Sequence, residues 1–473
     1  MTVLRIFIPI IIKRDFIMYF KRIIDGYLEQ WAKKKDHKPM LLRGARQVGK
    51  STAVRHLGET FDNFVEINFE RQPEYKKIFK RDLLVTRIVS EISAMCAMPI
   101  IPGKTLLFFD EIQECQEAIM SLRFFKEDMP GLHVIAAGSL LEFALAELPT
   151  FGVGRIHSMY MYAMTFDEYL EANGETLMLD YKRKASPDRP LPEPLHNKLI
   201  ALVRSYFLVG GMPEVVGKWV ETHDYLQCQE VQDDIISGYE DDFPKYRKKV
   251  DPILLRLTLR SVASQVTKKF SYAEVGGGYR AEEVKKALEM LLLAGICIQT
   301  VRTDANGLPL GSESDFGYRK MMILDSGLLL RLLNMSSVDV SRLTSDILTE
   351  DTAALVNKGP LAEMVAGLEL LRYKTPNLRH DLYYWVRLAK NSQAEIDYIE
   401  ARDGGVLPVE VKAGMRGGMK SLWIFMREKE LVSAVRCSLE NFGRFEYIDP
   451  EDSNAIRKVE ICPLYAISNL ISS

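Results

Sequence analysis

The sequence contains few of the residues that build disulfide frameworks or metal centres. Its 473 residues include six cysteines, at positions 96, 115, 228, 297, 437 and 462, and seven histidines. No two cysteines form a C-x-x-C pair, and none lies near a histidine at the spacing of metal ligands. This pattern predicts reduced thiols in a cytoplasmic protein and argues against a disulfide framework or a zinc site.

The chain also lacks an excess charge of either sign, internal repeats and low-complexity tracts. Lys plus Arg number 62 and Asp plus Glu number 64, which gives a net charge of −2. Hydrophobic residues make up 47% and charged residues 27%. This composition excludes a disordered chain, a collagen-like repeat, a coiled-coil rod and a globally basic nucleic-acid-binding protein. The length is typical of about three folded domains.

Long apolar segments are missing as well. The mainly apolar run at residues 3–12 is too short to span a bilayer, and no small-residue cleavage site follows it. Met18-Tyr19-Phe20 resembles a natural start, and we therefore expect residues 1–17 to be an N-terminal extension, with a short hydrophobic anchor as the alternative. No other segment approaches a transmembrane helix, and no membrane partner is expected.

Residues 19–170 alternate between short apolar segments and amphipathic stretches such as 84–95 and 117–127. Continuous apolar strands separated by helices indicate a parallel sheet that is covered on both faces. The predicted strands are residues 40–43, 64–69, 105–110, 133–137 and, as a fifth, 156–163.

Beyond residue 165 the pattern is first helical and then mixed. Helices are predicted at 166–173, 195–209 and 225–239, with a break at Gly210-Gly211-Met212-Pro213. A helix-turn-helix unit with a wing is expected next, from helices at 252–267 and 281–293 and strands at 296–302 and 320–324. In the last block, a helix at 361–373 precedes two strands, 394–401 and 406–413, which the turn at Asp403-Gly404 joins into a hairpin.

The most specific motif is a phosphate-binding loop. Gly44-Ala45-Arg46-Gln47-Val48-Gly49-Lys50-Ser51 matches G-x-x-x-x-G-K-[ST], and it follows a predicted strand and opens a helix. In such loops the backbone N–H groups converge on phosphate oxygens, the lysine reaches the β- and γ-phosphates, and the hydroxyl ligates Mg²⁺. We therefore expect residues 44–52 to bind a nucleoside triphosphate, with Lys50 and Ser51 in these roles and Thr52 completing the site.

An acidic pair follows the most apolar predicted strand, about 60 residues after the loop. The carboxyl ends of parallel strands meet at the edge of the sheet where the phosphate loop also lies. Asp110 is expected to hold Mg²⁺, and Glu111 to orient or deprotonate the attacking water. Alone, such a pair could instead cap the next helix.

Two further positions have two interpretations each. Ser139 follows the fourth predicted strand and either senses the γ-phosphate or caps the next helix. Arg155 precedes the fifth strand and either neutralises transition-state charge, in cis or toward a neighbouring subunit, or is a solvated loop arginine.

Together these motifs resemble the prokaryotic AAA+ ATPases that carry a C-terminal DUF4143 domain. The resemblance runs through residues 43–50, 109–113, 137–139, 154–155 and 165–169, and 210–214 and 324–328 resemble later landmarks. It covers the chain from about residue 19 to the C-terminus. It implies ATP as the nucleotide and an α/β fold with a P-loop AAA+ parallel-sheet core.

The resemblance also implies most of the domain plan, although residues 1–17 have no counterpart in the family and are expected to be an N-terminal extension. We predict the ATPase core at 18–165 and a helical lid at 166–250. A winged-helix region at 251–335 and a polar linker at 336–358 are expected to precede a restriction-endonuclease-like α/β domain at 359–473.

A second site is predicted in that last domain. Glu363, Asp397, Glu410 and Lys412 resemble the PD-(D/E)xK nuclease pattern, in which acids bind Mg²⁺ and lysine stabilises the nucleophile. Asp397 and Glu410 are the expected metal ligands. A half-buried hairpin also alternates charged and apolar residues, so that a folded but inactive domain is the alternative.

The expected function is an ATPase that acts on or with double-stranded DNA through its C-terminal half. Residues 251–302 carry eight Lys or Arg and five Asp or Glu, a net of +3, with Arg280, Lys285 and Lys286 at the start of the second helix. The alternative is a nucleotide-gated switch that binds a protein partner, and a third interpretation is a nuclease whose assembly depends on ATP. An oligomer is compatible with each interpretation.

Overall fold

The computed structural model describes most of the chain. The described residues are 19–139, 141–147, 154–247, 249–333, 358–388, 394–412 and 418–471. The predicted extension at 1–17 and residues 336–357 of the predicted linker lie outside them.

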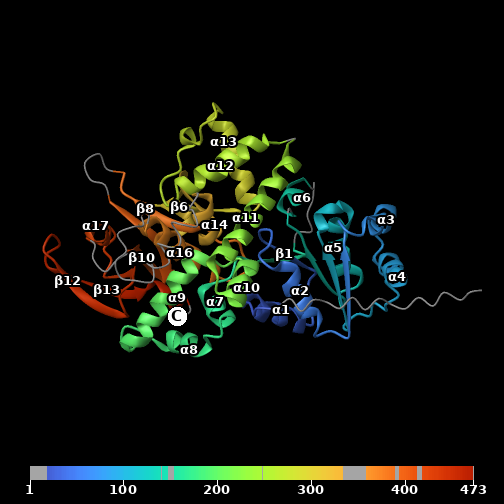
Figure 1. Ribbon diagram of the computed structural model, residues 1–473, viewed down its shortest axis with the longest axis horizontal. Helices are drawn as coiled ribbons and strands as arrows, with labels where there is room; N and C mark the ends of the chain where they lie inside the picture. The colour runs from blue at the N-terminus through green and yellow to red at the C-terminus, as the bar shows by residue number, and fades with distance from the viewer. Residues whose placement is uncertain are drawn as a thin grey trace, which may run out of the picture.

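The N-terminal part is a parallel sheet with helices on both faces, as predicted (Figure 1). Its strand order is β2-β3-β4-β1-β5, and every pairing is parallel. The strands are β1 (Met40–Arg43), β2 (Asn63–Asn68), β3 (Thr105–Asp110), β4 (His133–Ala137) and β5 (His157–Tyr160). This order brings the C-terminal ends of β1, β3 and β4 together in the middle of one edge.

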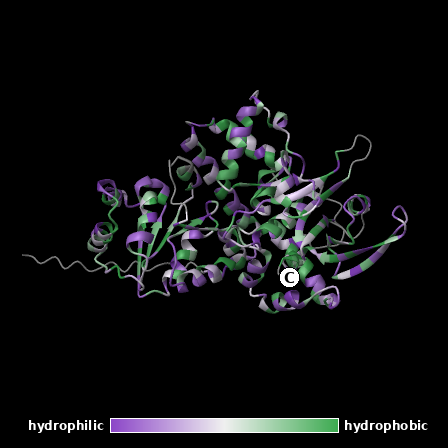
Figure 2. Cartoon of the chain, turned by 180° about the vertical axis from the view of Figure 1, so that it is seen from behind, coloured by the Kyte–Doolittle hydropathy of each residue, from purple (hydrophilic) through white to green (hydrophobic). Residues whose placement is uncertain are grey.

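Alternate side chains of the central strands enter two different cores. Leu42, Phe108 and Ile135 pack with α1 (Ile23–Lys33) and α2 (Lys50–Gly58) on one face. The other face packs against α3 (Lys76–Arg81), α4 (Val85–Cys96), α5 (Gln116–Asp128) and α6 (Leu141–Glu147). Because both faces are covered, the strands are apolar throughout, which made them visible in the sequence. Figure 2 shows hydrophobic residues along these strands and hydrophilic ones on the outer helices.

Helices occupy the middle of the chain. They are α7 (Phe166–Ala172), α8 (Thr176–Lys184), α9 (Glu193–Val209), α10 (Pro213–Thr222) and α11 (Tyr225–Asp242). The break at 210–213 separates α9 from α10, a helix that was not predicted. Pro213 stands at the start of α10, where its missing N–H costs nothing and its fixed φ favours the helix.

The next segment combines helices and a hairpin. It consists of α12 (Pro252–Ser264), α13 (Ala281–Leu293), β6 (Cys297–Thr303), β7 (Ser314–Ile323) and α14 (Ser326–Leu332). Short 3-10 helices lie at Pro73–Tyr75, Ile112–Glu114, Phe243–Tyr246, Tyr272–Val275, Leu310–Glu313 and Leu464–Leu470. Both long helices of the expected helix-turn-helix unit are therefore present.

The C-terminal sheet is mixed and includes the hairpin of the preceding segment. Its order is β12-β13-β11-β10-β9-β8-β6-β7, and β6 pairs with β8 in parallel. The C-terminal elements are α16 (Lys358–Arg372), β8 (Leu382–Val386), β9 (Glu395–Arg402), β10 (Gly405–Val411), α17 (Lys420–Glu428), β11 (Ser433–Ser438), β12 (Gly443–Asp449) and β13 (Ala455–Pro463). The predicted winged-helix region and the predicted last domain thus share one sheet.

A buried polar network joins α16 to the ATPase core and the middle helices. The Arg372 guanidinium donates to the carbonyl oxygens of Met164 and Leu324, at 3.0 and 2.8 Å. The Tyr206 hydroxyl donates to Glu369 at 3.0 Å, and Arg372 and Glu369 form an ion pair at 3.5 Å. Breaking such a network would leave buried charges unpaired, which is unfavourable. The network therefore fixes α16, the ATPase core and the middle helices relative to one another. Within the described residues, no helix combines the length and apolarity that crossing a membrane requires.

Candidate functional site

The phosphate loop connects β1 to α2 at the middle of the sheet edge. Gly44 has a φ of +145°, and a Cβ there would lie 2.1 Å from the carbonyl oxygen of Met161. Only glycine fits this close approach of two backbones. The loop ends at Gly49, and α2 begins at Lys50, which directs its first N–H groups toward the loop interior.

Lys50 is folded over the loop. Its Nζ donates to the carbonyl oxygens of Gly44 and Ala45, at 3.0 and 2.6 Å, and the residue is 7% exposed. Burial lowers the pKa of Lys50 to about 8, although the negative charges of Glu111 and Asp110 oppose this shift. A buried ammonium with only partial charge compensation is a strong site for an anion such as a phosphate.

Ser51 and Asp110 meet as the motif predicts. The Ser51 hydroxyl donates to Oδ1 of Asp110 at 2.9 Å, and the Asn68 amide donates to Oδ2 at 3.1 Å. Burial is the main cause that raises the pKa of Asp110. The hydroxyl and carboxylate oxygens lie side by side and are the ligand types that Mg²⁺ prefers, so these residues fit the ion. Asn68 was missed, although it lies in a predicted strand and ends β2 at the same edge.

Glu111 lies beside Ser139 and Gln113. Oε2 of Glu111 accepts hydrogen bonds from Nε2 of Gln113 at 2.7 Å and from the Ser139 hydroxyl at 3.2 Å. Glu111 precedes the 3-10 helix at Ile112–Glu114, but its side chain makes no capping hydrogen bond. This geometry favours the catalytic interpretation of Glu111 over the capping one. It also joins the predicted sensor Ser139 directly to the predicted base.

Arg155 points away from this cluster. Its Nε forms an ion pair with Glu127, and its side chain is 53% exposed. Within one chain, therefore, Arg155 does not join the residues around Lys50, and its role toward a neighbouring subunit stays a prediction. Thr52 lies half-buried in the first turn of α2.

The middle and C-terminal segments contact the loop. Nη1 of Arg46 lies 2.5 Å from Oδ2 of Asp242 in α11, and the Tyr239 hydroxyl donates to the carbonyl oxygen of Arg46 at 3.0 Å. Gly295, between α13 and β6, packs on Ala45, where a Cβ would lie 3.2 Å from its backbone nitrogen. These contacts depend on tertiary packing, and no local motif predicted them.

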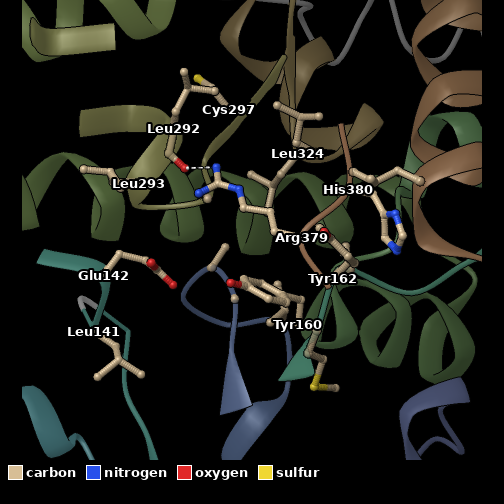
Figure 3. A pocket seen from close by; sticks show the side chains of 18 of the residues that line it. Leu141, Glu142, Tyr160, Tyr162, Leu292, Leu293, Cys297, Leu324, Arg379 and His380 are labelled. Atoms are coloured by element: carbon tan, nitrogen blue, oxygen red, sulfur yellow. Dashed lines mark hydrogen bonds between the residues drawn. The ribbon is translucent and has the colours of Figure 1, made fainter. Parts of the chain in front are cut away.

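A cleft beside these contacts separates the core from the C-terminal half (Figure 3). Tyr160 and Tyr162, at and just beyond the end of β5, lie on one side, and Arg379 lies on the other. The Arg379 guanidinium donates to the carbonyl oxygen of Leu292 at 3.1 Å. Gly44 and Ser139 also line this cleft, which places it next to the phosphate loop.

The predicted C-terminal site residues converge on α16, β9 and β10. The ammonium group of Lys412 donates to Glu410 at 2.5 Å, and Oδ2 of Asp397 accepts from the Val411 N–H at 2.8 Å. Burial, together with the negative charge of Asp397, raises the pKa of Glu363 to about 8 and that of Glu410 to about 7. All four predicted residues therefore lie in one charged region, in which Glu410 is buried and the other three are half-buried.

Two residues of this region were missed. Oxygens of Glu363, Glu395 and Asp397 lie within 4.8 Å of one another, a spacing that fits a metal ion, whereas Glu410 is not in this group. The Lys320 ammonium from β7 lies 2.9 Å from Glu363 and 2.5 Å from Glu395, and its side chain is 3% exposed. The sequence offered one indication of this role, namely a lysine within the apolar segment of β7. However, only the pairing of β6 with β8 brings Lys320 to the carboxylates.

Three family models match the chain. An AAA domain, AAA_14, matches residues 36–170, and two domains of unknown function match elsewhere: DUF8612 at 200–339 and DUF4143 at 358–449. A comparison with curated proteins finds no match.

A comparison with solved structures finds distant similarity to several proteins, three of which are as follows. A Walker-type ATPase of Pyrococcus abyssi is 16% identical, with a TM-score of 0.42, over 67% of this chain and 96% of that one. The Orc1 protein of Aeropyrum pernix in complex with DNA is 12% identical, with a TM-score of 0.29, over 70% and 97%. RuvB of Thermotoga maritima is 17% identical, with a TM-score of 0.28, over 59% and 88%. The chain therefore combines an AAA domain of the AAA_14 family, which carries the P-loop, with a C-terminal DUF4143 domain.

Proposed function

We propose that the protein binds ATP with Mg²⁺ and hydrolyses it. One observation carries this proposal: Lys50, Ser51, Asp110 and Glu111 converge where β1, β3 and β4 end. A protein that only binds nucleotide needs the lysine but not an acid hydrogen-bonded to a second polar residue beside it.

Each residue of the site has a distinct task. Lys50 exchanges the carbonyl oxygens of Gly44 and Ala45 for phosphate oxygens. Ser51 and Asp110 would hold Mg²⁺, which when bound would neutralise negative charge on the phosphates. Glu111 orients the attacking water and accepts its proton, while the Ser139 hydroxyl holds the Glu111 carboxylate in place.

Steady-state ATP hydrolysis with Mg²⁺ tests this proposal, with Lys50→Ala as the blank. We expect turnover in the wild type and none above background in the variant, because the phosphates lose their buried cation. Wild-type turnover equal to that of Lys50→Ala would refute it.

For the C-terminal half we propose a role on double-stranded DNA. Lys268, Lys269, Arg280, Lys285 and Lys286 are all exposed around α12 and α13, where they can contact phosphates. Exposed Glu282 and Glu283 on the same helix weaken this surface. The hydrolysis assay, repeated with duplex DNA, tests the coupling: a several-fold higher rate supports it, and an unchanged rate favours a protein partner.

The second candidate function is a nucleotide-gated switch with an inactive nuclease-like domain. Lys320 favours it, because its ammonium already forms ion pairs with Glu363 and Glu395, two of the three carboxylates that could hold a metal ion. Under this alternative no Mg²⁺-dependent nicking of plasmid DNA is expected, whereas an active domain would nick it.

A further inference from the structure

Arg46 lies in the phosphate loop, two residues after its first glycine. Its side chain is 41% exposed, and its backbone carbonyl accepts the hydrogen bond from Tyr239. Arg46 and Ser139 line one small cavity, and the Ser139 hydroxyl donates to Glu111 at 3.2 Å. The Arg46 side chain therefore borders the residues that are proposed to handle the γ-phosphate. The general motif leaves this position open, so that arginine is not required there for binding phosphate.

Asp242 holds Arg46 from the end of α11. Oδ2 of Asp242 lies 2.5 Å from the Arg46 guanidinium, and Oδ1 lies 2.8 Å from the Lys245 ammonium. The Asp242 side chain is 10% exposed. The nearly buried Asp242 carboxylate therefore forms the ion pair with Arg46 that a phosphate group could form in its place.

In P-loop NTPases an arginine at the γ-phosphate adds to the loop lysine and Mg²⁺, and the acceleration that it supplies is large. Arg155 pairs with Glu127 and does not reach this site within the chain. We propose that Arg46 is the cation that contacts the γ-phosphate in cis, and that ATP competes with Asp242 for it. This inference rests on the proposed ATP binding and adds the means by which the site distinguishes ATP from ADP.

The exchange has a structural consequence. Asp242 ends α11, and the 3-10 helix at Phe243–Tyr246 follows it directly. When the γ-phosphate binds Arg46, Asp242 keeps its contact with Lys245, and the loop loses one of its links to the middle helices. ADP lacks the γ-phosphate and leaves the link intact. Arg46 is thus both a catalytic residue and the sensor of the nucleotide state.

The test compares the affinity of ADP with that of AMP-PNP, a non-hydrolysable ATP analogue, by isothermal titration calorimetry with Mg²⁺. Arg46→Ala should weaken AMP-PNP binding by roughly tenfold, the value of a charge-assisted hydrogen bond, and leave ADP binding within about twofold. Arg46→Lys should restore part of the preference, because it retains the charge. Arg189→Ala, at an exposed arginine between α8 and α9, is the matched control and should change neither affinity.

Asp242→Asn gives a change in the opposite direction. It should strengthen AMP-PNP binding several-fold and leave ADP binding unchanged, since Arg46 is no longer held by a carboxylate. In the double variant that also carries Arg46→Ala, Asp242→Asn should no longer strengthen AMP-PNP binding.

The outcomes separate the two proposals. If the wild type binds neither nucleotide, the proposed ATPase function fails. If it binds both, but Arg46→Ala weakens ADP and AMP-PNP equally or weakens neither, only the role of Arg46 is refuted. The role of Arg46 is also refuted if Asp242→Asn binds AMP-PNP more weakly than the wild type does. It is refuted as well if Asp242→Asn strengthens AMP-PNP binding even when Arg46 is replaced by alanine.

Discussion

Replacing Glu111 by glutamine removes the proposed base and changes little else. The carboxylate accepts hydrogen bonds from Gln113 and Ser139 through one oxygen, Oε2. An amide oxygen can accept both of these hydrogen bonds, so the side chain keeps its position. The amide cannot accept a proton from water, and Glu111→Gln therefore isolates the chemical step from the architecture of the site.

The size of the effect follows from these contacts. Loss of a positioned general base costs about 10²–10⁴ in rate, or roughly 3–5 kcal/mol of barrier. Ser139→Ala removes a single neutral-to-charged hydrogen bond at 3.2 Å, and the base stays in place. We expect that variant to lose on the order of tenfold. The rates should therefore fall in the order wild type, Ser139→Ala, Glu111→Gln.

Single-turnover hydrolysis of ATP with enzyme in excess measures the rate of the chemical step, and a titration with ADP measures nucleotide binding separately. Glu114→Gln is the matched control, because Glu114 lies three residues further along and pairs at the surface with Lys76. It should keep the wild-type rate. The reasoning is refuted if Glu111→Gln hydrolyses ATP within about threefold of the wild type, or if it loses ADP binding as Lys50→Ala is expected to.

Three other perturbations test separate parts of the molecule. Arg155→Ala should slow hydrolysis more than ATP binding if the side chain serves a neighbouring subunit, and equal activity at all protein concentrations would contradict a role in trans. Mg²⁺-dependent nicking of plasmid DNA, if present, should vanish in both Asp397→Ala and Lys412→Ala, and nicking that persists in both would assign it elsewhere. Burial raises the pKa of Glu369 to about 7 from its usual 4.5, so its protonated form favours the folded state. Its contribution is therefore complete below pH 4.5 and is lost as the pH rises to about 7. Glu369→Gln should reduce the pH-dependent change in the free energy of unfolding by about 3 kcal/mol over this window, and an unchanged slope would refute the assignment.

The ATPase core could be predicted because its signals are local. Strands that are buried on both faces are apolar at every position, and 105–110 is wholly buried in the structure as expected. The loop motif fixes Lys50 and Ser51, and the parallel order brings Asp110 to them. Each of these steps depends on residues within one strand or one turn, which is why the sequence carries them.

The C-terminal site depended on contacts between distant residues. Asp397 and Glu410 could be placed in a hairpin from the turn at Asp403-Gly404, and β9 and β10 pair as expected. Lys320 and Glu395 could not be assigned, because Lys320 reaches the carboxylates only through a hairpin that joins the sheet beside β8. Register between strands that are far apart in sequence has no local signature.

The same pairing gives the nucleotide site a direct route to the C-terminal half. Gly295 packs on Ala45 of the loop, and β6 begins two residues later, at Cys297. β6 pairs with β7, which carries Lys320, and with β8, whose other neighbour β9 carries Asp397. A loop that shifts when it closes on phosphates would therefore press on the strand that positions both a cation and a carboxylate of the second site. Packed sheets transmit such displacements because their interiors leave no free volume to absorb them. A larger residue at Gly295, where φ is +73° and the loop backbone is in contact, is therefore expected to displace the phosphate loop and the start of β6 together.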